Sequence, residues 1–61
     1  MTASELYVLA DAYYQAKDEL IDARAAVRAA RGDDDIERQA RIQLEKAESA
    51  VKITRAAYFS A

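Results

Sequence analysis

The sequence predicts an all-α fold, an antiparallel two-helix hairpin that amounts to an alanine-rich coiled coil. Three observations predict it. The chain of 61 residues has no proline and one glycine. Apolar residues recur at heptad spacing on both sides of that glycine. Three aspartates follow the glycine and mark the break in the pattern. We expect a single domain, residues 1–61, with one helix over about 3–31, a turn over about 32–34 and a second helix over about 35–60.

The heptad pattern defines a seam on each helix, because spacings of three and four alternate along it. The seam residues are Leu6, Leu9, Tyr13, Ala16, Leu20, Ala23, Val27 and Ala30, then Ala40, Leu44, Ala47, Val51, Thr54, Tyr58 and Ala61. When the chain folds back at the aspartates, one register satisfies both helices: facing residue numbers sum to 67, as for Leu20 and Ala47. Nearly every layer then pairs a large side chain with a small one, which allows close packing of the helices.

The turn residues suit the end of one helix and the start of the next. Gly32 is expected at the C′ position, where the backbone adopts positive φ. Arg28 and Arg31 are expected in the last turn of the first helix, and residues 33–35 at the start of the second, where their charges suit the helix dipoles. Two pairs fit capping boxes, Thr2 with Glu5 and Asp34 with Glu37.

Two functional interpretations of this turn compete with the structural one. Arg31-Gly32-Asp33 matches the adhesion tripeptide that integrins recognise. The N-terminal stretch MTASELYVLADAYY lacks the basic and apolar regions of a secretion signal, however, and the chain has no cysteine. The aspartate run also lacks the ligand spacing of a calcium-binding loop. We therefore interpret the segment as a helix-connecting turn and expect no metal.

No catalytic constellation is recognisable. The chain has neither histidine nor cysteine, which removes the commonest general base and the thiol nucleophile. Its paired carboxylates would lie on helix surfaces, where a thin hairpin offers no cleft for a substrate. We expect no enzyme activity, cofactor or small-molecule substrate. The chain lacks the run of about 20 apolar residues that a membrane span needs, and the absence of cysteine fits a cytoplasmic location.

One side of the seam, heptad positions e and b, forms what we call the basic flank. Eight basic and two acidic residues occupy it, giving +6, and the rest of the chain carries one basic and nine acidic residues, giving −8. Candidate anion or nucleic-acid contacts are Arg24, Arg28, Arg31, Arg38 and Arg41. Candidate protein-interface residues on the same flank are Tyr7, Ala10, Tyr14, Ile21 and Phe59. The register predicts that Tyr7 and Phe59 lie side by side at the open end of the hairpin.

The other side of the seam, positions g and c, forms what we call the second flank. Its apolar members are Val8, Ala12, Ala26, Ile36, Ala50, Ile53 and Ala57. This makes the apolar arc wider than a two-stranded seam needs. We expect the surplus to be covered in a four-helix bundle formed by dimerisation, or by docking on a larger protein. The simpler alternative is that both flanks are solvated, with arginine stems packed along the core edge.

Two classes of function fit these surfaces. The first is a non-enzymatic protein-interaction module, of the kind found among small bacterial and phage accessory proteins, adaptors, inhibitors and assembly subunits. The second is a nucleic-acid binder. A helical-hairpin dimer with a basic face resembles, in architecture and without a shared motif, the Rop family of plasmid RNA-binding proteins. That resemblance implies phosphate contacts by the arginines and stacking by Tyr14. The acidic sequence pI, about 4.9, favours the first class.

Overall fold

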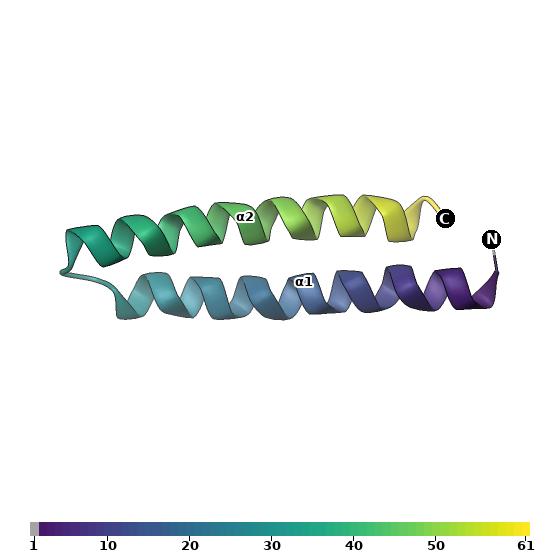
Figure 1. Ribbon diagram of the computed structural model, residues 1–61, viewed down its shortest axis with the longest axis horizontal. Helices are drawn as coiled ribbons and strands as arrows, with labels where there is room; N and C mark the ends of the chain where they lie inside the picture. The colour runs from purple at the N-terminus through teal and green to yellow at the C-terminus, as the bar shows by residue number, and fades with distance from the viewer. Residues whose placement is uncertain (1) are drawn as a thin grey trace.

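The computed structural model describes residues 2–61, which form two antiparallel helices. Helix α1 spans Ala3–Ala29 and helix α2 spans Asp34–Phe59. The chain reverses direction once, so the start of α1 and the end of α2 lie at the same end of a rod measuring 48 × 13 × 11 Å (Figure 1). The predicted all-α hairpin is confirmed.

The interior of the hairpin consists of small side chains. The only buried apolar residues within 2–61 are four alanines, each at a predicted seam position: Ala16, Ala30, Ala40 and Ala47. The larger seam residues are half-buried: Leu9, Tyr13, Leu20, Val27, Leu44, Val51 and Tyr58. Two seam residues near the open end, Leu6 and Ala61, are exposed. The least exposed residues are thus those of the predicted seam. Alanine lets the two backbones approach closely, and the larger seam side chains beside it are only partly covered.

Thr54 is the one threonine of the predicted seam, and its hydroxyl forms a hydrogen bond within its own helix. The Thr54 hydroxyl donates to the backbone carbonyl of Ala50 at 2.6 Å, one turn earlier in α2. A half-buried hydroxyl bonded in this way needs no partner on the facing helix. Thr54 can therefore act as a small seam residue.

The turn begins earlier than the sequence pattern indicates. Gly32 has the expected positive φ, +96°. However, α1 ends at Ala29, so Arg31 lies in the turn and not in the last turn of the helix. The Arg31 amide donates to the Arg28 carbonyl at 3.5 Å, and the Asp33 amide donates to the Ala30 carbonyl at 3.1 Å. In each bond the donor lies three residues after the acceptor, so the chain tightens into a turn that starts after Ala29 and includes the glycine.

The structure shows one of the two hydrogen bonds of the capping box predicted for α1, and it corrects the box predicted for α2. Thr2 caps α1, since its side-chain oxygen accepts the Glu5 amide at 3.2 Å. The Asp34–Glu37 capping box is wrong, because Asp33 is the cap of α2. Asp33 has extended backbone angles, φ −119° and ψ 104°, and its carboxylate accepts the Ile36 amide at 3.2 Å. Gly32 already turns the chain, so the extended residue that a cap requires falls immediately after it.

Replacing Asp33 by alanine should therefore lower the free energy of unfolding by about 1 kcal/mol, because a helix amide loses its partner. The matched control is Asp34→Ala, which removes the same charge from the same end but no capping bond, and should cost only a few tenths of a kcal/mol. Urea denaturation followed by circular dichroism at fixed chain concentration measures both. Equal losses would show that charge, and not the capping bond, sets the effect.

Candidate functional site

The structure brings parts of the basic flank from both helices into one groove. Leu20 and Arg24 of α1 face α2 across it. The α2 side is lined by Glu48, Val51, Lys52, Arg55, Ala56 and Phe59. We call this the basic groove. The half-buried seam residues Leu20 and Val51 form its floor, so the groove opens directly onto the apolar interior of the hairpin.

An aromatic cluster closes the end of this face. It consists of Tyr13 and Tyr14 from α1 with Tyr58 and Phe59 from α2. The Tyr13 ring centroid lies 5.6 Å from that of Tyr14, 5.9 Å from that of Tyr58 and 5.7 Å from that of Phe59. These separations are typical of favourable aromatic pairs. Tyr14 and Phe59 remain 56% and 68% exposed, so the cluster ties the helices together and still presents ring surface to solvent.

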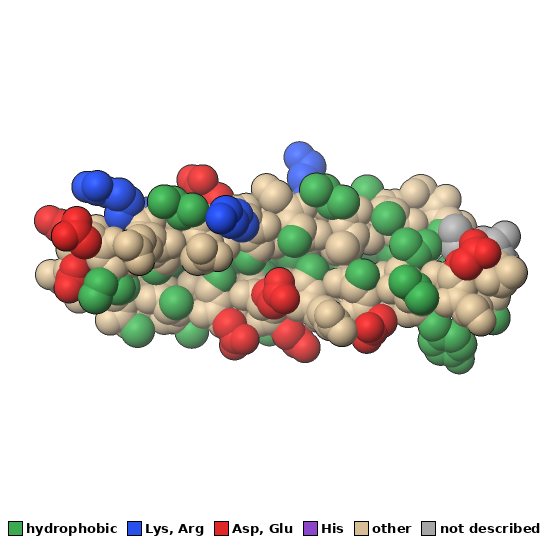
Figure 2. Space-filling view, in the orientation of Figure 1, with side chains coloured by type: hydrophobic (Ala, Val, Ile, Leu, Met, Phe, Trp, Pro, Cys, Tyr) green, Lys and Arg blue, Asp and Glu red, His purple; other side chains and the backbone are tan. Residues whose placement is uncertain are grey.

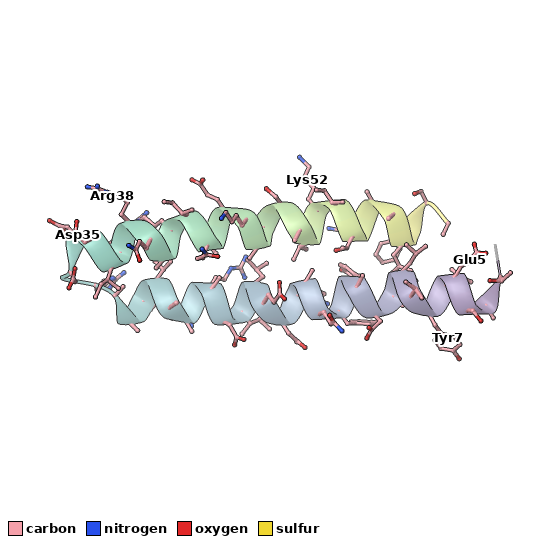
Figure 3. All side chains as sticks on the ribbon, in the orientation of Figure 1. Glu5, Tyr7, Asp35, Arg38 and Lys52 are labelled. Carbon is pink, nitrogen blue, oxygen red and sulfur yellow. The ribbon has the colours of Figure 1, made fainter. Side chains whose placement is uncertain are left out.

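Tyr7 does not belong to this cluster, and the prediction that it lies beside Phe59 is wrong. Its side chain is 77% exposed and projects from the edge of α1 away from α2 (Figure 3). Tyr7 lines a shallow pocket with Leu6, Ala10 and Tyr58, while the Phe59 ring lies against the rings of Tyr58 and Tyr13. Tyr7 points away from α2 whereas the Phe59 ring packs against Tyr13 of α1, so equal height along the rod does not bring the Tyr7 and Phe59 rings together.

The cations near the groove lie over aromatic rings. The Lys17 ammonium is 5.3 Å from the Tyr13 ring centroid and 5.7 Å from that of Tyr14. The Arg55 guanidinium is 5.9 Å from the Phe59 centroid. Within residues 2–61 the sole ion pair joins Arg41 to Glu37 at 2.8 Å, outside the groove. The cations of the groove therefore form no ion pair with a carboxylate of the described residues, although Glu48 lines the same groove.

The remaining predicted residues of the basic flank are dispersed along the rod. Ile21 is 60% exposed and Ala10 is half-buried. All five candidate arginines are exposed, and Arg24 is the one that lines the groove. Arg38 extends from the outer edge of α2 near the turn, on the same edge as Lys52 (Figure 3). The structure thus divides the basic flank into a groove near the open end and separate arginines near the turn.

The second flank is apolar toward its ends and polar in its middle. Val8 and Ile53 are each 68% exposed and Ile36 is 56% exposed. Ala12 and Ala57 are exposed, and Ala50 is half-buried. The middle is a groove lined by Glu19, Asp22, Ala23, Gln43, Lys46, Ala47 and Ala50. Figure 2 shows acidic side chains gathered over α1 and apolar side chains between the two helices.

One exposed apolar residue was missed by the sequence interpretation. Ile42 is 46% exposed at the outermost heptad position of α2, beyond both flanks. It shares a shallow pocket with Lys46, Ala50 and Ile53. A search for isoleucine at the outward heptad position, where polar residues are usual, would have found it.

The chemistry that these surfaces offer is binding through apolar and cationic groups. Among the described residues, no side-chain polar atom is buried without a hydrogen bond, and no three acidic side chains are grouped to hold a metal ion. Neither helix, over the part of the chain described, is sufficiently long and apolar to span a membrane. No family model, no curated protein and no solved structure matches this chain.

The aromatic cluster should contribute to stability, and Tyr7 should not. Tyr13→Ala removes the ring contacts with Tyr14, Tyr58 and Phe59. It should lower the free energy of unfolding by about 2 kcal/mol. Tyr7→Ala is the same change at a 77% exposed site and should lie within about 0.5 kcal/mol of the wild type. Urea titrations at one chain concentration compare the two. A loss for Tyr7→Ala as large as that for Tyr13→Ala would contradict this placement.

Proposed function

We propose that this hairpin is a non-enzymatic protein-interaction module that completes its apolar core against other protein surfaces. The observation that carries the proposal is the distribution of apolar residues. Burial reaches only four alanines, while nine large apolar side chains are at least 40% exposed in residues 2–61. Exposed apolar and aromatic surface of this extent on a small chain is typical of an interface.

The surface area supports the same conclusion. A compact monomer of this mass, 6.8 kDa, exposes about 3,950 Å² of accessible surface. The hairpin exposes 4820 Å². The excess, roughly 900 Å², is close to the ~800 Å² that each partner buries in an interface of standard size. One protein interface per hairpin would restore the burial expected of a compact domain.

A second copy of the chain is the partner that we propose for the second flank, giving a homodimeric four-helix bundle. Charge favours this flank over the basic one, because the basic flank would set +6 against +6. The second flank carries Glu5, Glu19 and Asp22 with Lys46 among them. A twofold axis parallel to the helices stacks α1 of one copy on α2 of the other. Lys46 of each copy then lies at the height of the other copy's acidic pair, Glu19 and Asp22.

The apolar ends of the second flank fit the same arrangement. Val8 and Ala12 of one copy would lie at the height of Ile53 and Ala57 of the other, so that large side chains meet small ones. An interface related by a twofold axis closes on itself at two copies. The basic flank stays on the outside of such a bundle. There it is free to dock on a larger protein, as an accessory, adaptor, inhibitor or assembly subunit does.

Nucleic-acid binding by a Rop-like dimer is the second candidate function. The observation that favours it is the exposure of Arg24, Arg28, Arg31, Arg38 and Arg41. Of these five, Arg41 alone is paired with a carboxylate of the described residues. The others could contact phosphates, and Tyr14, which is exposed toward the open end of the hairpin, could stack on a base.

The bundle predicts that Ile53→Lys disrupts self-association, because it buries a charge in the proposed interface. Sedimentation equilibrium should give twice the 6.8 kDa chain mass for the wild type, and a dimer weakened by about tenfold or more for the variant. Ile21→Lys is the matched control, because Ile21 is a similarly exposed isoleucine on the basic flank, outside the bundle interface, and this variant should dimerise as the wild type does. A helical wild-type chain that stays monomeric at all concentrations would contradict the bundle.

The nucleic-acid candidate predicts a steep dependence on salt. Binding of a single-stranded RNA should weaken by about tenfold or more between about 50 mM and about 200 mM salt, through counterion release. Replacing Arg24 and Arg28 together by glutamine should reduce both affinity and salt slope. Filter binding with nuclease-treated protein measures this. Absence of retained RNA at low salt would eliminate the candidate.

A further inference from the structure

We propose that the basic groove binds an acidic amphipathic helix of a partner protein. This inference rests on the proposed function as an interaction module, and it names the surface and the chemistry of the partner. The groove differs from the second flank in charge, in its aromatic content and in its direct access to the seam residues Leu20 and Val51.

The shape of the groove suits a helix. It runs along the rod between two antiparallel helices, the position in which a third helix packs against a pair. Its α2 wall extends from Glu48 to Phe59, about 17 Å at the rise of an α-helix, which matches roughly three turns of a bound helix. Leu20, Val51 and Ala56 would contact the apolar stripe of that helix, and Phe59 would cover one end of it.

The charges of the basic groove indicate which residues should flank the apolar stripe of the bound helix. Arg24 lies on the α1 side of the floor, and Lys52 and Arg55 lie on the α2 side. Lys17 lies outside the groove lining, over the Tyr13 ring of the neighbouring aromatic cluster. No carboxylate of residues 2–61 forms an ion pair with these four, and Glu48 is the one acidic residue of the lining. Cations on both sides of an apolar floor complement a helix with glutamate or aspartate on both sides of an apolar stripe.

Neither a nucleic acid nor a second copy complements the groove as well. Phosphates could pair with the cations and one base could stack on Phe59, but the aliphatic floor of Leu20 and Val51 offers no hydrogen bonds to bases. Helix α1 of another copy is acidic on its outer side. Its exposed apolar residues Val8 and Ala12 and its acidic residues lie on the second flank, however, which is the surface that the proposed bundle already buries.

The test uses the full chain and a dye-labelled synthetic peptide of about three heptads, with leucine at a and d and glutamate at e and g. A second peptide carries lysine in place of every glutamate. Fluorescence anisotropy should show binding of the glutamate peptide, with affinity falling as salt rises, and little binding of the lysine peptide. Equal affinity for both peptides would overturn the proposal, because it would show that charge does not select the partner.

Two cations on the same edge of α2 provide a matched pair of variants. Lys52→Glu reverses a charge that lines the groove, and should weaken binding of the glutamate peptide by about fivefold or more. Arg38→Glu reverses a charge near the turn, outside both the groove and the second flank, and should alter binding by less than about twofold once salt screens the distant charge. Circular dichroism verifies that both variants remain helical. Equal effects of the two substitutions would overturn the assignment of the groove.

Two further outcomes separate this inference from the function on which it rests. If the wild-type chain forms dimers but does not bind the glutamate peptide, the groove assignment fails and the interaction module stands. If a helical chain neither self-associates nor binds the peptide, both proposals fail. Tighter binding of a single-stranded oligonucleotide than of the glutamate peptide, lost in Lys52→Glu, would give the groove to nucleic acid and overturn the proposal.

Discussion

Close approach of two helices across layers of alanine is the constraint on which the rest of this structure depends. Ala16, Ala30, Ala40 and Ala47 are the only buried apolar residues within 2–61, and their small side chains allow the two backbones to approach closely. The larger seam residues are only half-buried, and the isoleucines, Tyr7, Tyr14 and Phe59 remain on the outside. A thin interior and an apolar exterior are two consequences of the same packing, and both proposed interfaces follow from the second.

Segregation of charge then assigns different partners to the two flanks. Like charges resist self-pairing of the basic flank, whereas the second flank contains both signs near its centre, at Glu19, Asp22 and Lys46. Lys17 and Arg55 lie over aromatic rings, with no acidic partner among the described residues. Cations held in this way keep most of their charge available to a ligand. We infer a division of roles, in which one flank closes the bundle and the other selects a partner by charge.

The sequence predicted the fold well because its strongest signals are local and periodic. The alternation of large residues with alanine specified the seam, and one glycine specified the turn. Which aspartate caps α2 could not be predicted, since three consecutive aspartates all suit that role and backbone geometry after Gly32 chooses Asp33. The register gave the height of Tyr7 and Phe59 along the rod but not their directions around it. The aromatic cluster was missed because Tyr13 was assigned to the seam and Phe59 to the flank, although their rings meet.

The central claim is that the isolated hairpin is incomplete and gains its stability from a protein interface. Thermal unfolding followed by circular dichroism, over about a hundredfold range of chain concentration, tests it most directly. If association supplies the missing burial, the midpoint should rise steadily with concentration, and the most dilute sample should lose helix first. A cooperative transition at a high temperature that does not change with concentration would show that the alanine seam alone suffices, and would contradict the account.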